Sequence, residues 1–385
     1  MSKQFPRVER LIGWYSNFAV YILNTLLLLF CVELAAQVVL WSYTHYVKQD
    51  PRPELTIYQE EPWNETYWIE LDKATQGAYY QDYIGWRTKP YQGQYVQVNQ
   101  NGLRVTPSAD CSLEAFKVFM FGGSTMWGVG APDSGTIPSY FQKLLSNRRS
   151  EQPICVVNFG ILAGVSTQGV IQLEEELKRG NIPDWVIFYD GANDVIAAYQ
   201  SGRAGSVQFS NMIKDRFEGT EPLAFRLHRS FASFKILASL AQKIKGGQPF
   251  VWTYLRPGVY NDTLATEVAT IYLQNQKMVS VLAETYGFTD YFFWQPLVFT
   301  GNKPLTPEEK GYIDSLDPGL VTLYNKVYPM IADAALERAN LYYIVNLFDN
   351  ETEQVFIDYV HISPHGNKRI AEEMFASIGH SMTKE

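Results

Sequence analysis

The sequence predicts an α/β domain built on a parallel β-sheet that helices cover on both faces. Three runs, at residues 117–121, 154–160 and 184–191, are apolar along their length, which is typical of strands buried on both sides. Two stretches with helical periodicity, 136–149 and 167–180, alternate with these runs. This alternation of strands and helices favours a parallel sheet.

An apolar segment near the N-terminus predicts a transmembrane anchor over residues 14–43. Its run from Phe18 to Trp41 is long enough, at about 1.5 Å per residue, to cross about 30 Å of hydrocarbon. Basic residues precede the run and aromatic residues bracket it, namely Lys3, Arg7 and Arg10, and Trp14, Tyr15, Trp41 and Tyr43. This pattern favours a single pass with residues 1–13 in the cytoplasm and the rest of the chain outside it. Glu33 is costly at membrane depth, so an amphipathic helix packed on the protein is the alternative.

The rest of the chain divides into a small entry module and the α/β domain. Residues 44–112 begin as a polar linker and continue as a β-rich module, with a hairpin expected at 94–105. The α/β domain extends over 113–385 and carries a helical insertion at about 200–250. The insertion is basic and amphipathic, which fits a membrane-surface or lid role. Such a pattern is more often found on an ordinary packed helix whose basic side faces solvent.

Composition excludes several classes of protein. Hydrophobic residues make up 46% of the chain and charged residues 19%, so a sizeable core is expected. The formal net charge of -8 comes without a basic stripe, which argues against a nucleic-acid partner. Three cysteines, Cys31, Cys111 and Cys155, are too few for a structural zinc site. Two buried thiols are favoured for Cys111 and Cys155, although the two could pair in an oxidising compartment.

The turn after the first strand reads VFMFGGSTMWGVG and admits two explanations, a phosphate-binding loop or an exposed nucleophile. A phosphate-binding P-loop needs lysine and a hydroxyl after its second glycine, but Val129 and Gly130 stand there. The dinucleotide pattern G-x-G-x-x-G is absent from this turn too. We therefore expect no cofactor, and Ser124 becomes a candidate nucleophile.

A nucleophilic serine needs a base, a group that orients the base, and donors for the oxyanion. The segment DYVHISP supplies Asp358 and His361, three residues apart on one turn. His365 is the rival base, but it lacks an aspartate three residues before it. The third strand ends in GAND, where Asn193 is either an oxyanion donor or an ordinary turn residue.

Taken in order, the blocks GGST, NFGILAG, GAND and DYVH resemble those of the SGNH hydrolases, also called GDSL esterases, over roughly Phe116 to Met374. The resemblance implies a flavodoxin-like three-layer α/β/α sandwich and a triad of Ser124, His361 and Asp358. It also implies oxyanion donors from the Ser124 amide, the Asn193 side chain, and the amide of either Ala163 or Gly164.

Two features of the first block separate this chain from related patterns. Gly123 stands where the family name has an acidic residue. Met126 stands where the G-x-S-x-G elbow of ordinary α/β-hydrolases has its second glycine, which argues against that fold.

The first functional hypothesis is a membrane-anchored serine esterase that removes an acyl group, acetyl first among the candidates, from a carbohydrate or related ester outside the cytoplasm. The second is an O-acyltransferase that uses the same triad on cell-envelope glycans. The third is a non-catalytic carbohydrate-binding module, which the set of Ser124, Asn193 and His361 argues against. Neither a metal nor a cofactor is expected.

Overall fold

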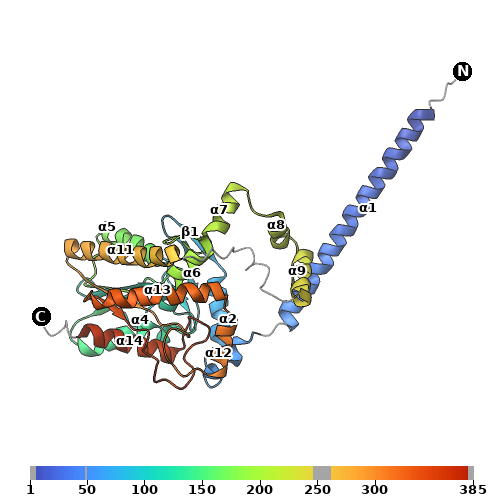
Figure 1. Ribbon diagram of the computed structural model, residues 1–385. Helices are drawn as coiled ribbons and strands as arrows, with labels where there is room; N and C mark the ends of the chain where they lie inside the picture. Colours follow the sequence, from blue (N-terminus) through green and yellow to red (C-terminus); the bar gives the residue numbers. More distant parts are fainter. Residues whose placement is uncertain (1–5, 48–49, 246–261, 380–385) are drawn as a thin grey trace. The chain divides into compact units, whose positions relative to one another are not determined.

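The computed structural model of the chain describes residues 6–47, 50–245 and 262–379 (Figure 1). The chain forms two compact units, one of Met1–Asp50 with Met212–Arg256, and one of Pro51–Asn211 with Pro257–Glu385. Three of the predicted parts lie partly outside the described residues, namely the cytoplasmic segment 1–13, the insertion at 200–250 and the domain 113–385.

The larger unit is built on a parallel sheet, as predicted, and this sheet has five strands. Its strands lie in the order β6-β5-β7-β8-β9. Their bounds are β5 Phe116–Gly122, β6 Ile154–Asn158, β7 Trp185–Asp190, β8 Thr289–Trp294 and β9 Leu341–Tyr343. Numbered along the chain, this order is 2-1-3-4-5, the flavodoxin-like arrangement, which confirms the predicted fold. The order reverses beside β5, so the carboxyl ends of β5, β6 and β7 meet at the place where open α/β sheets bind ligands.

Helices cover both faces of this sheet (Figure 1). One face carries α4 (Ile137–Arg148) and α14 (Pro364–Gly379), and the other carries α5 (Ser166–Lys178), α6 (Ala192–Ser201), α11 (Asp262–Tyr286) and α13 (Pro318–Leu336). Alternate residues of β5 enter the two cores, Val118 and Met120 on the α4 side, and Phe119 and Phe121 on the α5 side. Burial on both sides explains why the strands read as apolar throughout. Three short elements complete this part of the unit: α3 (Ser124–Trp127), η4 (Asp133–Gly135) and α12 (Pro307–Asp314).

The entry segment of this unit holds two small antiparallel sheets, β1-β2 and β3-β4. Their strands are β1 Ala78–Gln81, β2 Gly85–Thr88, β3 Tyr91–Gln92 and β4 Gln97–Val98. The expected hairpin is present as a bridge between Val98 and Arg104. Sequence analysis missed the helix α2 (Asn64–Thr75), which follows the short turns η2 (Arg52–Glu54) and η3 (Thr56–Tyr58). Its buried face carries Tyr67, Trp68 and Leu71, which lie between the segment interpreted as a polar linker and the predicted hairpin.

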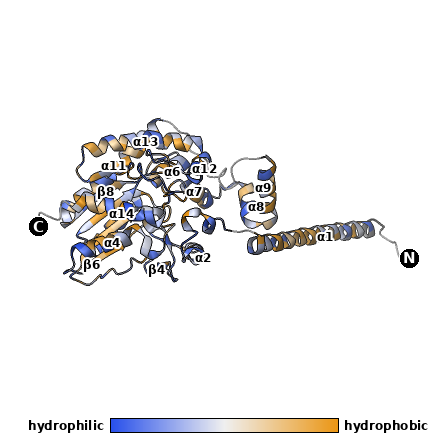
Figure 2. Cartoon of the chain, turned by 90° about the horizontal axis from the view of Figure 1, so that it is seen from below, coloured by the Kyte–Doolittle hydropathy of each residue, from blue (hydrophilic) through white to orange (hydrophobic). Residues whose placement is uncertain are grey.

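The smaller unit is helical. Its elements are α1 (Pro6–Ser42), the short π-helical η1 (Tyr43–Val47), α7 (Ser210–Glu218, which begins at the boundary of the larger unit), α8 (Leu223–Ser230) and α9 (Ala232–Lys245). Among the described residues, α1 is the one helix long and apolar enough to cross a membrane. Apolar residues run along most of its length (Figure 2).

The interpretation of Cys111 and Cys155 as two buried thiols is wrong. The two sulfurs form a disulfide, with Cα atoms 4.7 Å apart. Cys155 lies in β6, and the backbone N–H of Asp110 donates to the Ile154 carbonyl at 2.8 Å, which brings the end of the entry segment against this strand. Spacing in the sequence does not reveal this contact, because the two cysteines are 44 residues apart.

Candidate active site

Ser124 stands at the carboxyl end of the central strand β5. Gly123, in an extended conformation, precedes it, and Ser124 opens the four-residue helix α3. The helix ends at Gly128, whose φ of 100° lies in the left-handed region where glycine is favoured. This tight strand-to-helix turn leaves Ser124 half-buried at the edge of the sheet, with its hydroxyl available to a base.

A hydrogen-bond relay joins Ser124 to the C-terminal DYVH segment. His361 Nε2 lies 2.7 Å from Ser124 Oγ, and His361 Nδ1 lies 2.6 Å from Asp358 Oδ2. The other carboxylate oxygen, Oδ1, accepts from the backbone N–H groups of Val360 and His361, at 2.8 and 2.7 Å. Ser363, which directly precedes α14, accepts from the Gly366 N–H at 3.3 Å through its hydroxyl. Both ring nitrogens of His361 are therefore held, which orients the imidazole toward the serine.

The electrostatics of the relay keep Asp358 ionised. The protein around its carboxylate raises the pKa, but the charge of His361 and the hydrogen bonds from His361 and Val360 outweigh that effect. The net result is a pKa below the usual value for aspartate. An ionised Asp358 favours the tautomer in which Nδ1 carries the proton and Nε2 is free to accept one.

Asn193 lies against the serine turn. A β-carbon at position 123 would collide with Asn193 Nδ2, so the side-chain amide rests over the Gly123 backbone. Asn193 Nδ2 donates to the Gly164 carbonyl at 2.7 Å, and Oδ1 accepts from Gln208 Nε2 at 2.8 Å. An amide nitrogen has two hydrogens, so one remains for an oxyanion next to Ser124.

The structure distinguishes between the two candidate amides of the second loop. The Gly164 N–H donates to the Ile161 carbonyl at 2.9 Å. Within the described part of the chain, no acceptor is found for the N–H groups of Ala163 and Ser124. Ala163 has a φ of 59°, an uncommon value for a residue with a β-carbon and one that glycine adopts more readily. The geometry favours Ala163 over Gly164 as the backbone donor.

Asp194, beside Asn193, connects the loops that carry these donors. Its carboxylate accepts from Ser166 Oγ at 2.5 Å and from the Ser166 N–H at 3.2 Å. Ser166 opens α5, directly after the loop with Ala163, and Asp194 lies in the first turn of α6. Burial raises the pKa of Asp194 to about 6. Asp194 thus holds the second and third loops together through Ser166, a contact that the sequence does not reveal.

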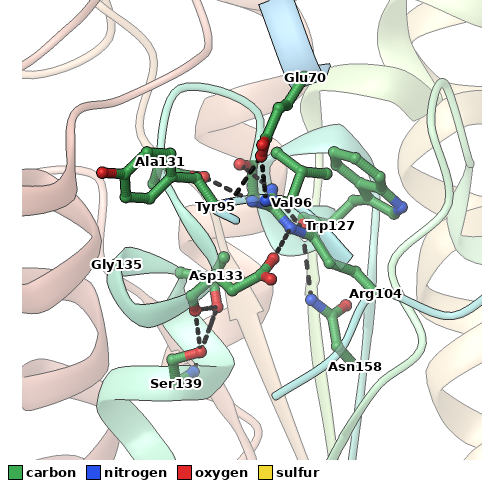
Figure 3. Close-up of polar contacts among 12 residues, drawn as sticks. Glu70, Tyr95, Val96, Arg104, Trp127, Ala131, Asp133, Gly135, Ser139 and Asn158 are labelled. Atoms are coloured by element: carbon green, nitrogen blue, oxygen red, sulfur yellow. Dashed lines mark hydrogen bonds and ion pairs between the residues drawn. The ribbon is translucent and has the colours of Figure 1, made fainter. Parts of the chain in front are cut away.

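Arg104, which sequence reasoning missed, supports the loop after Ser124 from the entry segment (Figure 3). Its guanidinium donates to Asp133 Oδ1 at 2.8 Å and to the carbonyls of Gly128 and Ala131 at 2.5 and 2.7 Å. It also stacks over the Trp127 ring, 4.6 Å from the centroid. The Arg104 side chain has no exposed surface, so this loop is braced by a buried, multiply bonded cation.

A second brace comes from β6. Asn158 Nδ2 donates to the carbonyls of Met126 and Trp127, at 3.0 and 3.3 Å. Asn158 Oδ1 accepts from the Gly160 N–H at 2.9 Å. Figure 3 shows Asn158 directed toward Trp127. Asn158 therefore connects the second block to the helix of the nucleophile.

The rival base His365 lies elsewhere, 3.7 Å from Glu351 and 54% exposed at its side chain. Among the described residues, no group of His, Cys, Asp and Glu side chains is arranged to hold a metal ion.

A family of known proteins matches this arrangement. The GDSL-like Lipase/Acylhydrolase family matches residues 118–374, which contain Ser124, Asn193, Asp358 and His361. The chain belongs to this family. GDSL-like hydrolases act on ester bonds, so the chain is an ester hydrolase, as the resemblance of its blocks predicted.

Solved structures with a similar fold include three esterases or lipases. The lipase Lip_vut3 from a goat rumen metagenome is 13% identical, with a TM-score of 0.39, over 68% of this chain and 97% of the lipase. A lipolytic G-D-S-L protein from Veillonella parvula is 14% identical, with a TM-score of 0.36, over 68% and 97%. A catalytic mutant of the acetylxylan esterase Axe2 from Geobacillus stearothermophilus is 17% identical, with a TM-score of 0.38, over 70% and 96%. No curated protein matches the sequence. The family assignment therefore rests on the match over residues 118–374.

Proposed function

We propose that this GDSL hydrolase is a membrane-anchored serine esterase that removes an acyl group, acetyl first among the candidates, from a carbohydrate or related ester outside the cytoplasm. The observation that carries the proposal is the continuous relay from Ser124 through His361 to Asp358. Each contact is 2.7 Å or shorter, so the serine has a base and the base has an orienting carboxylate.

The reaction follows from this geometry. His361 Nε2 takes the hydroxyl proton as Ser124 Oγ bonds to the ester carbonyl carbon, and the carbonyl oxygen becomes an oxyanion. The amides of Ser124 and Ala163 and the side chain of Asn193 stabilise that oxyanion. His361 then returns the proton to the leaving alcohol as the carbon–oxygen bond breaks, which leaves an acyl-serine. A water molecule then attacks the acyl carbon while His361 takes its proton. As the bond to Ser124 Oγ breaks, His361 returns that proton to Oγ, and the free acid leaves.

Two observations support an extracytoplasmic site. The helix α1 is long and apolar enough to anchor the chain, and basic residues lie on its N-terminal side. The Cys111–Cys155 disulfide is typical of proteins that fold in an oxidising compartment. The esters available to such a site are those of the cell envelope, which include acylated glycans, and this location is the reason for proposing a carbohydrate ester.

The test is covalent labelling of the full chain with a fluorophosphonate, followed by a panel of acetylated sugars and longer-chain esters. Ser124→Ala should lose both labelling and hydrolysis, while Ser134→Ala, an exposed serine on the neighbouring loop, should keep both. Labelling that persists in Ser124→Ala would contradict the assignment of the nucleophile. Transfer of acetyl to an added sugar in preference to water would instead favour the O-acyltransferase alternative.

A further inference from the structure

Glu33, the acidic residue within the apolar run of α1, has partners in the helical insertion. Its Oε1 accepts from the Ala232 N–H at 2.6 Å, and its Oε2 accepts from the Ser233 N–H at 3.2 Å and from Ser233 Oγ at 2.8 Å. Ala232 and Ser233 are the first two residues of α9. A carboxylate from α1 therefore caps the N-terminus of α9, 199 residues later in the chain.

This contact pairs two kinds of polar group, a carboxylate and the N–H groups at a helix N-terminus, that would be costly in a bilayer without hydrogen-bond partners. An ionised carboxylate near the centre of a membrane helix is energetically costly unless it has hydrogen-bond partners. The first N–H groups of a helix lack partners within the helix and carry its positive dipole end. Pairing Glu33 with the start of α9 satisfies both, which is the arrangement expected if both helices lie where water is scarce.

The packing of α9 against α1 gives the depth of the contact. Ala36 is 8% exposed and Leu40 half-buried, whereas the other residues of the second half of α1 are mostly exposed. α9 thus lies beside the last turns of α1 (Figures 1 and 2). Glu33 precedes Trp41, the end of the apolar run, by eight residues, or about 12 Å at about 1.5 Å per residue. With Trp41 at the membrane interface, the N-terminus of α9 reaches into the outer half of a hydrocarbon core about 30 Å thick.

A second apolar side of α9 has no cover from α1. Phe234, Leu237, Leu240 and Ile244 recur at intervals of three and four residues and are 39%, 59%, 51% and 84% exposed. Such spacing places them along one side of the helix. Four large apolar side chains facing water would be costly, whereas acyl chains would cover them at no such cost.

The charges of the insertion suit an anionic membrane surface. From Leu223 to Ile244 the sequence holds no Asp or Glu, while Arg226, Lys235 and Lys243 are exposed. Arg229, a fourth basic residue, pairs with Glu221 at 3.4 Å. Basic residues on an amphipathic helix are attracted to anionic headgroups near the membrane surface.

We propose that α8 and α9 form a membrane-contacting surface beside the anchor, with the apolar side of α9 among the acyl chains of the outer leaflet and the long basic side chains extending toward anionic headgroups. This inference rests on the proposed anchor and goes beyond it, since it assigns a second attachment from the middle of the chain. The insertion, for which a lid or a solvated face was also open, becomes a lipid-binding element.

The test places a fluorophore at residue 240 of the full-length protein in vesicles that contain phosphatidylglycerol. In a Cys31→Ser background, Leu240→Cys is labelled with an environment-sensitive dye, and lipids with a nitroxide on the acyl chain are added as quencher. Leu28→Cys, in α1, reports the anchor. Leu336→Cys is the matched control, at an 88% exposed leucine of the larger unit, which contains Ser124 and is called the catalytic unit from here on. We expect strong quenching at 28 and 240 and little at 336.

The outcomes separate the two proposals. Quenching at 28 without quenching at 240 overturns the membrane role of the insertion and leaves the anchor intact. Absence of quenching at both positions overturns both proposals. If quenching occurs at 240, adding Glu33→Ala should reduce it, because α9 loses its cap, and vesicles of phosphatidylcholine alone should also weaken it. Quenching at 240 that neither change alters would contradict the roles assigned to Glu33 and to the basic residues.

Discussion

The side-chain amide of Asn193 occupies the space that a β-carbon of residue 123 would need. Gly123 is thus the residue that lets the end of β7 approach the nucleophile turn after β5. The family name places an acidic residue at this position. In this chain the contact with Asn193 explains why glycine stands there instead. The same amide contacts the Gly164 carbonyl, which brings three loops together around Ser124.

Gly123→Ala is expected to lower kcat by roughly one to three orders of magnitude, because the added methyl displaces an oxyanion donor. The fold should persist, since the collision involves a side chain at the edge of the sheet. Gly311→Ala, which adds the same methyl in open space on α12, is the matched control. Steady-state hydrolysis of a chromogenic acetate ester measures the effect, and equal activities of the two variants would contradict the placement of Asn193.

Asn193→Ala should lower kcat by roughly two to three orders of magnitude and leave KM nearly unchanged, as expected for a donor that acts in the transition state. Gln208→Ala should cause a smaller loss, because Gln208 only orients the amide through its 2.8 Å hydrogen bond to Oδ1. The double variant should be no slower than Asn193→Ala, since the two residues act through one group. If the loss of kcat in the double variant equals the two single losses combined, Gln208 acts separately from Asn193.

How much of the site the sequence predicts depends on how local its contacts are. Asp358 and His361 form a motif within one turn, and Ser124 follows a recognisable strand, so these three are found together as expected. The choice between Ala163 and Gly164 depends on a backbone angle and on the Ile161 carbonyl, which a sequence does not display. Arg104 lies 29 residues from Asp133, and its other hydrogen bonds go to backbone carbonyls, so no pairing of residue types indicates its role.

Arg104→Ala should destabilise the larger unit by about 3–5 kcal/mol near neutral pH, because it leaves Asp133 buried without its partner. Burial already raises the pKa of Asp133, and Arg104 opposes that rise. Without Arg104 the pKa of Asp133 should rise further, so the folded variant keeps a proton that the folded wild-type protein has already lost, and the penalty should grow with pH between these two pKa values. Urea unfolding of the full chain in detergent between pH 4 and 8 measures this. Lys178→Ala, at an exposed pair, should change the free energy of unfolding by less than about 1 kcal/mol, and a penalty independent of pH would contradict the role of Asp133.

The last prediction concerns the side of the membrane on which the active site lies. A short basic N-terminal flank favours the cytoplasm, and a long following domain is translocated largely regardless of its own charge. Protease added to spheroplasts should therefore digest the catalytic unit and leave a small membrane-bound fragment that contains α1. The disulfide supports the same side, because the cytoplasm keeps most thiols reduced. Full protection of the catalytic unit until the membrane is lysed would place Ser124 in the cytoplasm, and it would remove the reason for proposing an envelope glycan as the substrate.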